Sequence, residues 1–283
     1  MSRLHELGSF FDLWNPLLIL ILVVIASSYV HIANNAKVNN NSDQQVSLKQ
    51  KISFMTGLVL FYIAQGSPLN FLGHHYLFSV HMFQQTIIFL TVPIFIWYAI
   101  PAWLLRPFVN ISWIRPIFYF ATRPLIAIFT FNMLISIYHM PYIMDGLMRI
   151  EWLHFWYHSL LMVTAFFMWF PVFGQLPECN GLSDLKKIAY IFGNGILLTP
   201  ACALIIFANT ILYDTYTQNI LPFNWLTPLN DQQLGGVIMK IIQEIVYGIA
   251  LSIVFFGWFR KEREKENEIE MNIEHMNSIK ILN

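Results

Sequence analysis

Long apolar runs constrain this chain more than any other feature. Seven runs of about 17 or more mostly apolar residues recur along the 283 positions, and each is long enough for a helix to cross a bilayer. Their residues do not alternate between apolar and polar, as the strands of a membrane β-barrel do. We therefore expect an all-α, polytopic integral membrane protein with about seven transmembrane helices. The candidate spans are 16–32, 52–72, 75–100, 117–139, 153–173, 188–213 and 234–259.

Composition supports this fold class and excludes several functions. Hydrophobic residues make up 57% of the chain and charged residues 11%, whereas roughly a quarter of a soluble domain is charged. Basic and acidic residues are equal in number, so the net charge gives no evidence for a nucleic-acid partner, and we expect none. Cys179 and Cys202 form no CxxC pair and no zinc-like spacing. The motifs of nucleotide-driven and hydrolytic enzymes are absent, and we predict a protein that is not an enzyme.

The basic residues predict an orientation. One set of loops holds only Arg3 and Arg149, and the other set holds nearly all remaining basic residues. Because Lys and Arg prefer cytoplasmic loops, we expect the N-terminus outside and the C-terminus inside. We divide the chain into a transmembrane domain, 1–259, and a charged cytoplasmic tail, 260–283. The basic side collects Lys37, Lys49, Lys51, Arg106, Arg115, Arg123, Lys186, Lys187, Arg260, Lys261, Arg263 and Lys265.

Histidines are concentrated at the predicted outer face. Six of the nine fall at the outer ends of three candidate spans, and His154 and His158 share one helical face because they are four residues apart. Methionines adjoin two of the six. Imidazole together with thioether sulfur, facing an oxidising compartment, favours copper. The predicted metal ligands are His81, His139, His154, His158, His74, His75, Met82 and Met140.

Simpler roles exist for some of these polar residues. An outer histidine can form hydrogen bonds with lipid headgroups or with the backbone, and methionine often fills gaps in apolar packing. The grouping of six histidines nevertheless favours a functional role, because ionisable residues at membrane depth are usually functional. Lys240 and Glu244 are expected to pair within the last span, with a proton path as the alternative. The segment 231–236 is expected to cap that helix or to support the histidines.

Five short segments occur in an order that resembles a known family. Together they are similar to the CtaG family of bacterial, caa3-type cytochrome c oxidase assembly factors, over roughly residues 50–260. Where many relatives carry a second histidine four residues after His81, this chain has Gln85. The segments are His81-Met82-Phe83-Gln84, Tyr138-His139-Met140-Pro141, His154 with His158, Trp169-Phe170-Pro171-Val172, and Asp231-Gln232-Gln233-Leu234-Gly235-Gly236.

The resemblance implies a function and partners. It implies a multi-pass protein of the bacterial plasma membrane that delivers or inserts copper at the CuB centre of the oxidase. The implied partners are the large subunit of cytochrome c oxidase, other assembly factors or copper chaperones, and membrane lipid.

Two other functions remain open. The first is a haem protein that transfers electrons, in which His81 and either His139 or His158 would be axial ligands. The second is a copper transporter, which would need ligands through the bilayer midplane; the inner half offers little beyond Cys202.

Overall fold

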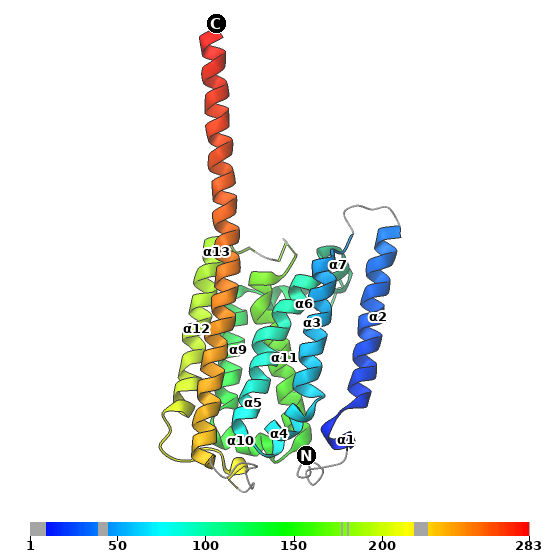
Figure 1. Cartoon of the computed structure of the whole chain (residues 1–283), viewed down its shortest axis with the longest axis vertical. Helices are drawn as coiled ribbons and strands as arrows, with labels where there is room; N and C mark the ends of the chain where they lie inside the picture. Colours follow the sequence, from blue (N-terminus) through cyan, green and yellow to red (C-terminus); the bar gives the residue numbers. More distant parts are fainter. Residues whose placement is uncertain (1–9, 39–44, 177, 180, 218–225, 283) are drawn as a thin grey trace.

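The computed structural model describes residues 10–38, 45–176, 178–179, 181–217 and 226–282. Within these ranges the chain forms helices and no strand. Figure 1 shows the long helices side by side in a bundle, with α13 (Pro228–Leu282) extending well beyond it at one end. Short helices cover the ends of the bundle: α1 (Phe10–Leu13), α7 (Ala102–Val109), α10 (Pro141–Met148) and the 3-10 turn η4 (Asp214–Tyr216).

Five to seven helices cross the membrane. Five described helices are long and apolar enough by themselves, and two bent pairs raise the number to seven. The prediction of an all-helical membrane protein with about seven spans is confirmed. The five are α2 (Pro16–Val38), the composite helix α5 (Phe78–Gln85), η3 (Thr86–Thr91) and α6 (Val92–Ala99), then α11 (Glu151–Phe173), α12 (Asp184–Ile206) and α13.

The first bent pair is α3 (Leu48–Gln65) with α4 (Pro68–His75), which meet at 42°. The candidate span 52–72 is thus broken after Gln65, and a short helix follows the break. The Ser67 side chain accepts a hydrogen bond from the Leu69 N–H, and Pro68 occupies the first turn of α4, where its missing N–H costs nothing.

The second bent pair is α8 (Ile114–Ala121) with α9 (Pro124–Tyr138), which meet at 80°. The sequence predicted one continuous span here. Pro124 disfavours helical geometry at the residue before it, and Arg123 indeed has ψ of 128°. The chain therefore turns sharply, and α9 alone runs on through the bundle.

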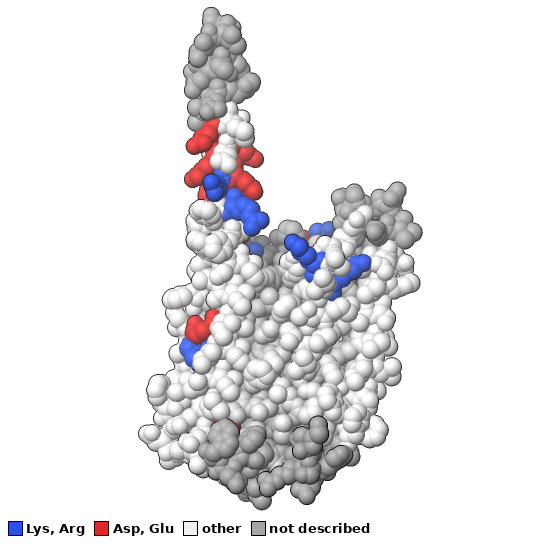
Figure 2. All heavy atoms as spheres, in the orientation of Figure 1, with Lys and Arg blue, Asp and Glu red and all other residues white. Residues whose placement is uncertain are grey.

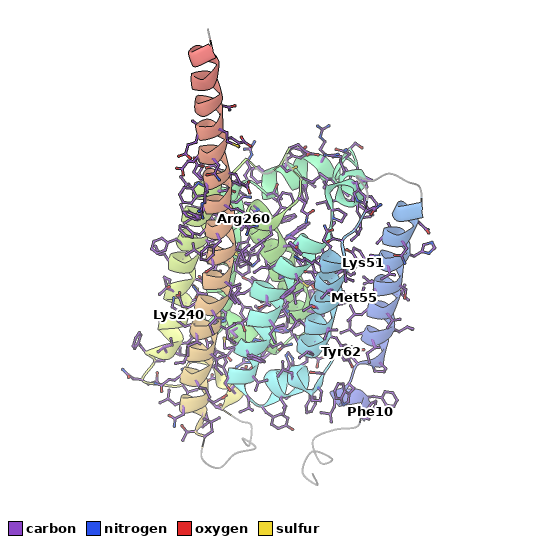
Figure 3. The ribbon with its side chains drawn as sticks, turned by 45° about the horizontal axis from the view of Figure 1, so that its top comes forward. Phe10, Lys51, Met55, Tyr62, Lys240 and Arg260 are labelled. Atoms are coloured by element: carbon purple, nitrogen blue, oxygen red, sulfur yellow. The ribbon has the colours of Figure 1, made fainter. Side chains whose placement is uncertain are left out.

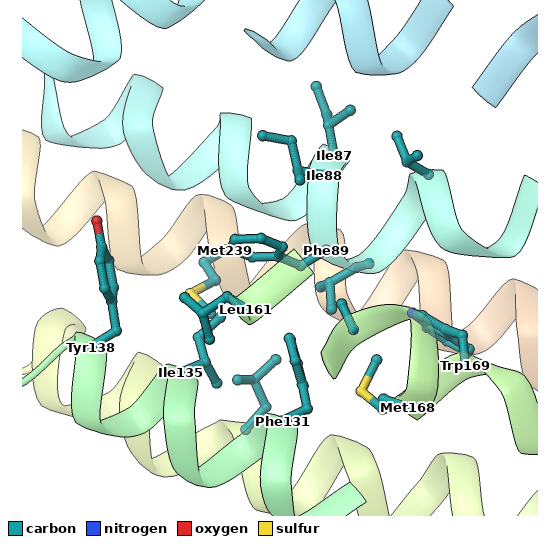
Figure 4. Close-up of a cluster of buried hydrophobic side chains, with 14 of the residues drawn as sticks. Ile87, Ile88, Phe89, Phe131, Ile135, Tyr138, Leu161, Met168, Trp169 and Met239 are labelled. Atoms are coloured by element: carbon teal, nitrogen blue, oxygen red, sulfur yellow. The ribbon is translucent and has the colours of Figure 1, made fainter. Parts of the chain in front are cut away.

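The composite helix α5–η3–α6 lies in the core. It is 67% buried, and its middle is a π-helix one turn beyond His81. Such π segments in α-helices are frequent at functional sites. Figure 4 shows the core around it, where Phe89, Phe131, Leu161 and Met239 come together from four different helices.

Charge separates the two ends of the bundle. Figure 2 shows Lys and Arg gathered near the end from which α13 projects, whereas the surface of the body is almost uncharged. The labels α4 and α10 lie at the opposite end in Figure 1. Helix α13 continues without a break from the span through Arg260 into the charged segment, as Figure 3 also shows.

Candidate functional site

A cavity of about 460 Å³ opens at the end of the bundle opposite the basic residues. Its walls come from the start of α2, the end of α3, and from α4, α5 and α11. Five of the predicted ligand histidines line this cavity, and we call it the histidine cavity. These are His74, His75, His81, His154 and His158.

The imidazoles lie within contact range of one another. The ring centroids of His154 and His158, one turn apart on α11, are 5.4 Å apart. From α4, the ring of His74 lies 4.9 Å from that of His154. From α5, the ring of His81 lies 6.2 Å from His154 and 6.5 Å from His158. Residues from three helices thus form one cluster.

Tyr138, the last residue of α9, links two of these histidines. Its hydroxyl oxygen lies 2.9 Å from Nε2 of His81 and 3.0 Å from Nε2 of His154. Because a hydroxyl carries a single proton, it donates to one imidazole and accepts from the other. The Gln85 amide lies 3.0 Å from the same His81 nitrogen. Two protein groups therefore compete for Nε2 of His81, whereas its buried Nδ1 has no partner among the described residues.

Asp231 fixes the helix that carries His81. Its carboxylate accepts hydrogen bonds from the backbone N–H groups of Phe78 and Ser79, at 2.7 and 3.3 Å, and from the Ser79 hydroxyl at 2.5 Å. The expected capping of its own helix is wrong, since Thr227 accepts there from the Asn230 N–H. Asp231 of α13 instead caps α5, which has no side-chain cap of its own.

Two glycines allow neighbouring helices to approach α5 closely. A Cβ on Gly73 of α4 would lie 3.0 Å from the His81 backbone, and one on Gly235 of α13 would lie 2.6 Å from the Phe78 ring. In addition, the Tyr216 hydroxyl donates to the Gly73 carbonyl at 2.8 Å. Helices α4 and α13 therefore hold the His81 end of α5 from two sides.

The remaining predicted ligands lie elsewhere. His139 is completely buried, and its Nδ1 lies 2.7 Å from the Ile135 carbonyl oxygen. Met82 is completely buried in the core, whereas Met140 is 51% exposed. None of the three lines the histidine cavity.

Sequence reasoning missed several lining residues. Met162 was identifiable, because it continues the four-residue spacing of His154 and His158 along one face of α11. Asn70 and Gln84 also line the cavity, and the Gln84 amide donates to Asn70 at 2.7 Å. They come from different helices, so no sequence spacing indicated them.

The donor set of the cavity is uncharged and rich in imidazole. Among the residues that the structure describes, no carboxylate lines it, which disfavours hard cations such as Mg²⁺ and Ca²⁺. Imidazole suits copper, and a thioether such as that of Met162 adds preference for Cu(I). No three His, Cys, Asp or Glu side chains of the described residues form a ready metal site. A metal here would be held by fewer imidazoles, with other donors.

These features define a class of protein: a multi-pass membrane protein with a cluster of imidazoles in a cavity at one end of its helix bundle. A family model described as cytochrome c oxidase caa3 assembly factor matches residues 28–261, and the chain belongs to this family. Comparison with curated proteins gives no match, and comparison with solved structures gives none either. The chain is thus a cytochrome c oxidase assembly factor of the bacterial plasma membrane, and the resemblance in its sequence is confirmed.

Proposed function

We propose that this assembly factor binds Cu(I) transiently in the histidine cavity and transfers it to the large subunit of its oxidase, where it becomes CuB. The observation that carries the proposal is the convergence of imidazoles from α4, α5 and α11 on one cavity, whose described lining residues include no carboxylate. The copper is cargo, and the factor is not an enzyme.

The geometry supports one set of ligands. His154 and His158 are the first pair, because they lie on one helix and line the same wall. Met162 supplies a thioether one turn beyond His158, and His74, whose ring lies 4.9 Å from that of His154, is not a third ligand in the present arrangement. In transfer, each Cu(I)–nitrogen bond is replaced by a bond to a ligand of the client, so the metal keeps its oxidation state.

Weak coordination suits a carrier. Nε2 of His81 is already in contact with Tyr138 and Gln85, so this nitrogen competes poorly for metal, and Nδ1 is the ring nitrogen without a partner among the described residues. A site with fewer strong ligands releases its cargo more readily than a closed site with four.

The experiment is a copper measurement on the detergent-purified protein under reducing conditions, with visible spectra. We expect bound Cu(I), no Soret band, and loss of most copper in His154→Ala/His158→Ala. The matched control is His31→Ala, on an exposed part of α2 where the imidazole contacts Asn35. A Soret band would favour the haem protein instead, and equal copper in all three proteins would refute the assigned ligands.

A further inference from the structure

A charged pair lies on the flank of the bundle formed by α12 and α13. Nζ of Lys240 is 2.6 Å from Oε1 of Glu244, and it also donates to the Thr199 hydroxyl at 2.8 Å. The predicted pairing within the helix is therefore confirmed. The Glu244 side chain is 61% exposed and that of Lys240 is 29% exposed. In Figure 1, α12 and α13 lie on the opposite flank from α2, which borders the histidine cavity.

The pair lies midway along the part of α13 that is long and apolar enough to span the bilayer, which corresponds to the bilayer midplane. Glu244 is midway along α13 between its start at Pro228 and the basic segment that begins at Arg260, about 24 Å from each at the rise of an α-helix. Figure 3 places Lys240 on the flank of the bundle, between its two ends. A carboxylate exposed to lipid at this depth is costly, and such residues are usually functional.

The surface around the pair is hollowed. One cavity of about 220 Å³ lies between α12 and α13, and an open strip of surface on α13 alone continues from it toward Arg260. Glu244 and Gly248 line both, and Ser252 lines the second.

Gly248 serves no packing purpose inside the chain. A Cβ there would meet nothing within 4 Å. By contrast, Gly236 on the same helix is needed, since a Cβ there would lie 2.8 Å from Ile206. Small residues on a lipid-facing helix allow the backbone of another transmembrane helix to come close.

We propose that this surface binds a transmembrane helix of the client oxidase that carries a hydrogen-bond donor at the bilayer midplane. The inference rests on the assembly function. The donor on the oxidase helix would bond to the Glu244 carboxylate. Lys240, which pairs with this carboxylate, also donates to the Thr199 hydroxyl. Contact over Gly248 and Ser252 would remove the carboxylate from lipid. We name this the α12–α13 surface, made by Thr199, Lys240, Glu244, Gly248 and Ser252.

A second copy of the chain fits this surface less well. Two copies related by a twofold axis along the membrane normal would place the Glu244 carboxylate opposite its own counterpart at the same depth, and a carboxylate cannot donate a hydrogen bond to another carboxylate. A different helix with a donor side chain has no such conflict.

The test removes both charges together. We expect Lys240→Met/Glu244→Met to accumulate in the membrane like the wild type, since apolar side chains replace an ion pair in an apolar setting without loss. The oxidase content of the cells should fall about tenfold. A photo-crosslinking residue at Ser252 should join to an oxidase subunit in the wild-type background and not in the double variant. The matched control is the same residue at Val59, a 56% exposed position on α3, where no oxidase crosslink is expected.

The outcomes separate this inference from the copper proposal. Wild-type oxidase content in the double variant, or crosslinking of Ser252 to a second copy, refutes the α12–α13 surface. If the double variant does not accumulate, Ser252→Leu is the second test, because its larger side chain would fill the α12–α13 surface from an exposed position. Normal oxidase content in Ser252→Leu would then refute the inference. Loss of oxidase in His154→Ala/His158→Ala alone would leave copper transfer standing without this surface. The reverse pattern would leave the surface standing without copper transfer.

Discussion

The carboxylate of Asp231 offers the sharpest test of how the histidine cavity is held in place. It accepts from the N–H groups of Phe78 and Ser79 and from the Ser79 hydroxyl, and it is only 1% exposed. In Asp231→Ala these donors lose their acceptor in a buried place. Each buried donor left without a partner costs about 1–3 kcal/mol, so for three donors we expect a loss of about 3–9 kcal/mol in the free energy of unfolding.

The assay is reversible unfolding of the detergent-purified protein, followed by tryptophan fluorescence, together with retained copper. Asp231→Asn should cost about 1–2 kcal/mol, because its one remaining oxygen still accepts one or two of the bonds. Asn230→Ala is the control, since that side chain is exposed. We expect copper retention to fall in Asp231→Ala even under conditions where the protein stays folded, because the α5 turn before His81 loosens. Equal stability of the Ala variant and the control would refute the capping argument.

Two further predictions follow from the neighbours of α5. Gly235→Leu should lower the free energy of unfolding by about 1–3 kcal/mol through overpacking against Phe78. The control Gly257→Ala, with nothing within 4 Å of the new Cβ, should be neutral or stabilising. Thermal unfolding measures both, and comparable losses of stability in the two variants would contradict the prediction. Gln85→His should raise the copper retained after dialysis, because it replaces an amide next to His81 with an imidazole; unchanged retention would exclude position 85 from the site.

Position relates the two proposed sites to the membrane. The histidine cavity lies at the end of the bundle away from most basic residues, and the α12–α13 surface lies at mid-depth on the other flank. The positive-inside rule predicts that this cavity faces the outer side.

Sequence alone determined the features that depend on one helix. Apolar runs predicted the spans, since transfer of a helix into lipid depends on its own residues. The four-residue spacing predicted the Lys240–Glu244 pair, which forms at 2.6 Å, and placed His154 and His158 on one face. An ordered set of short segments also gave the family, which the match over residues 28–261 confirms.

Tertiary structure decided which helices meet. It brought His74 next to His154 and left His139 buried outside the cavity, although His74 and His139 both lie at the ends of helices near the same face. It also placed Asp231 on the N-terminus of α5, more than 150 residues earlier in the chain. Spacing along one helix carries no information about such contacts, because they depend on which helices are neighbours in the bundle and on how closely glycines such as Gly73 and Gly235 let them approach.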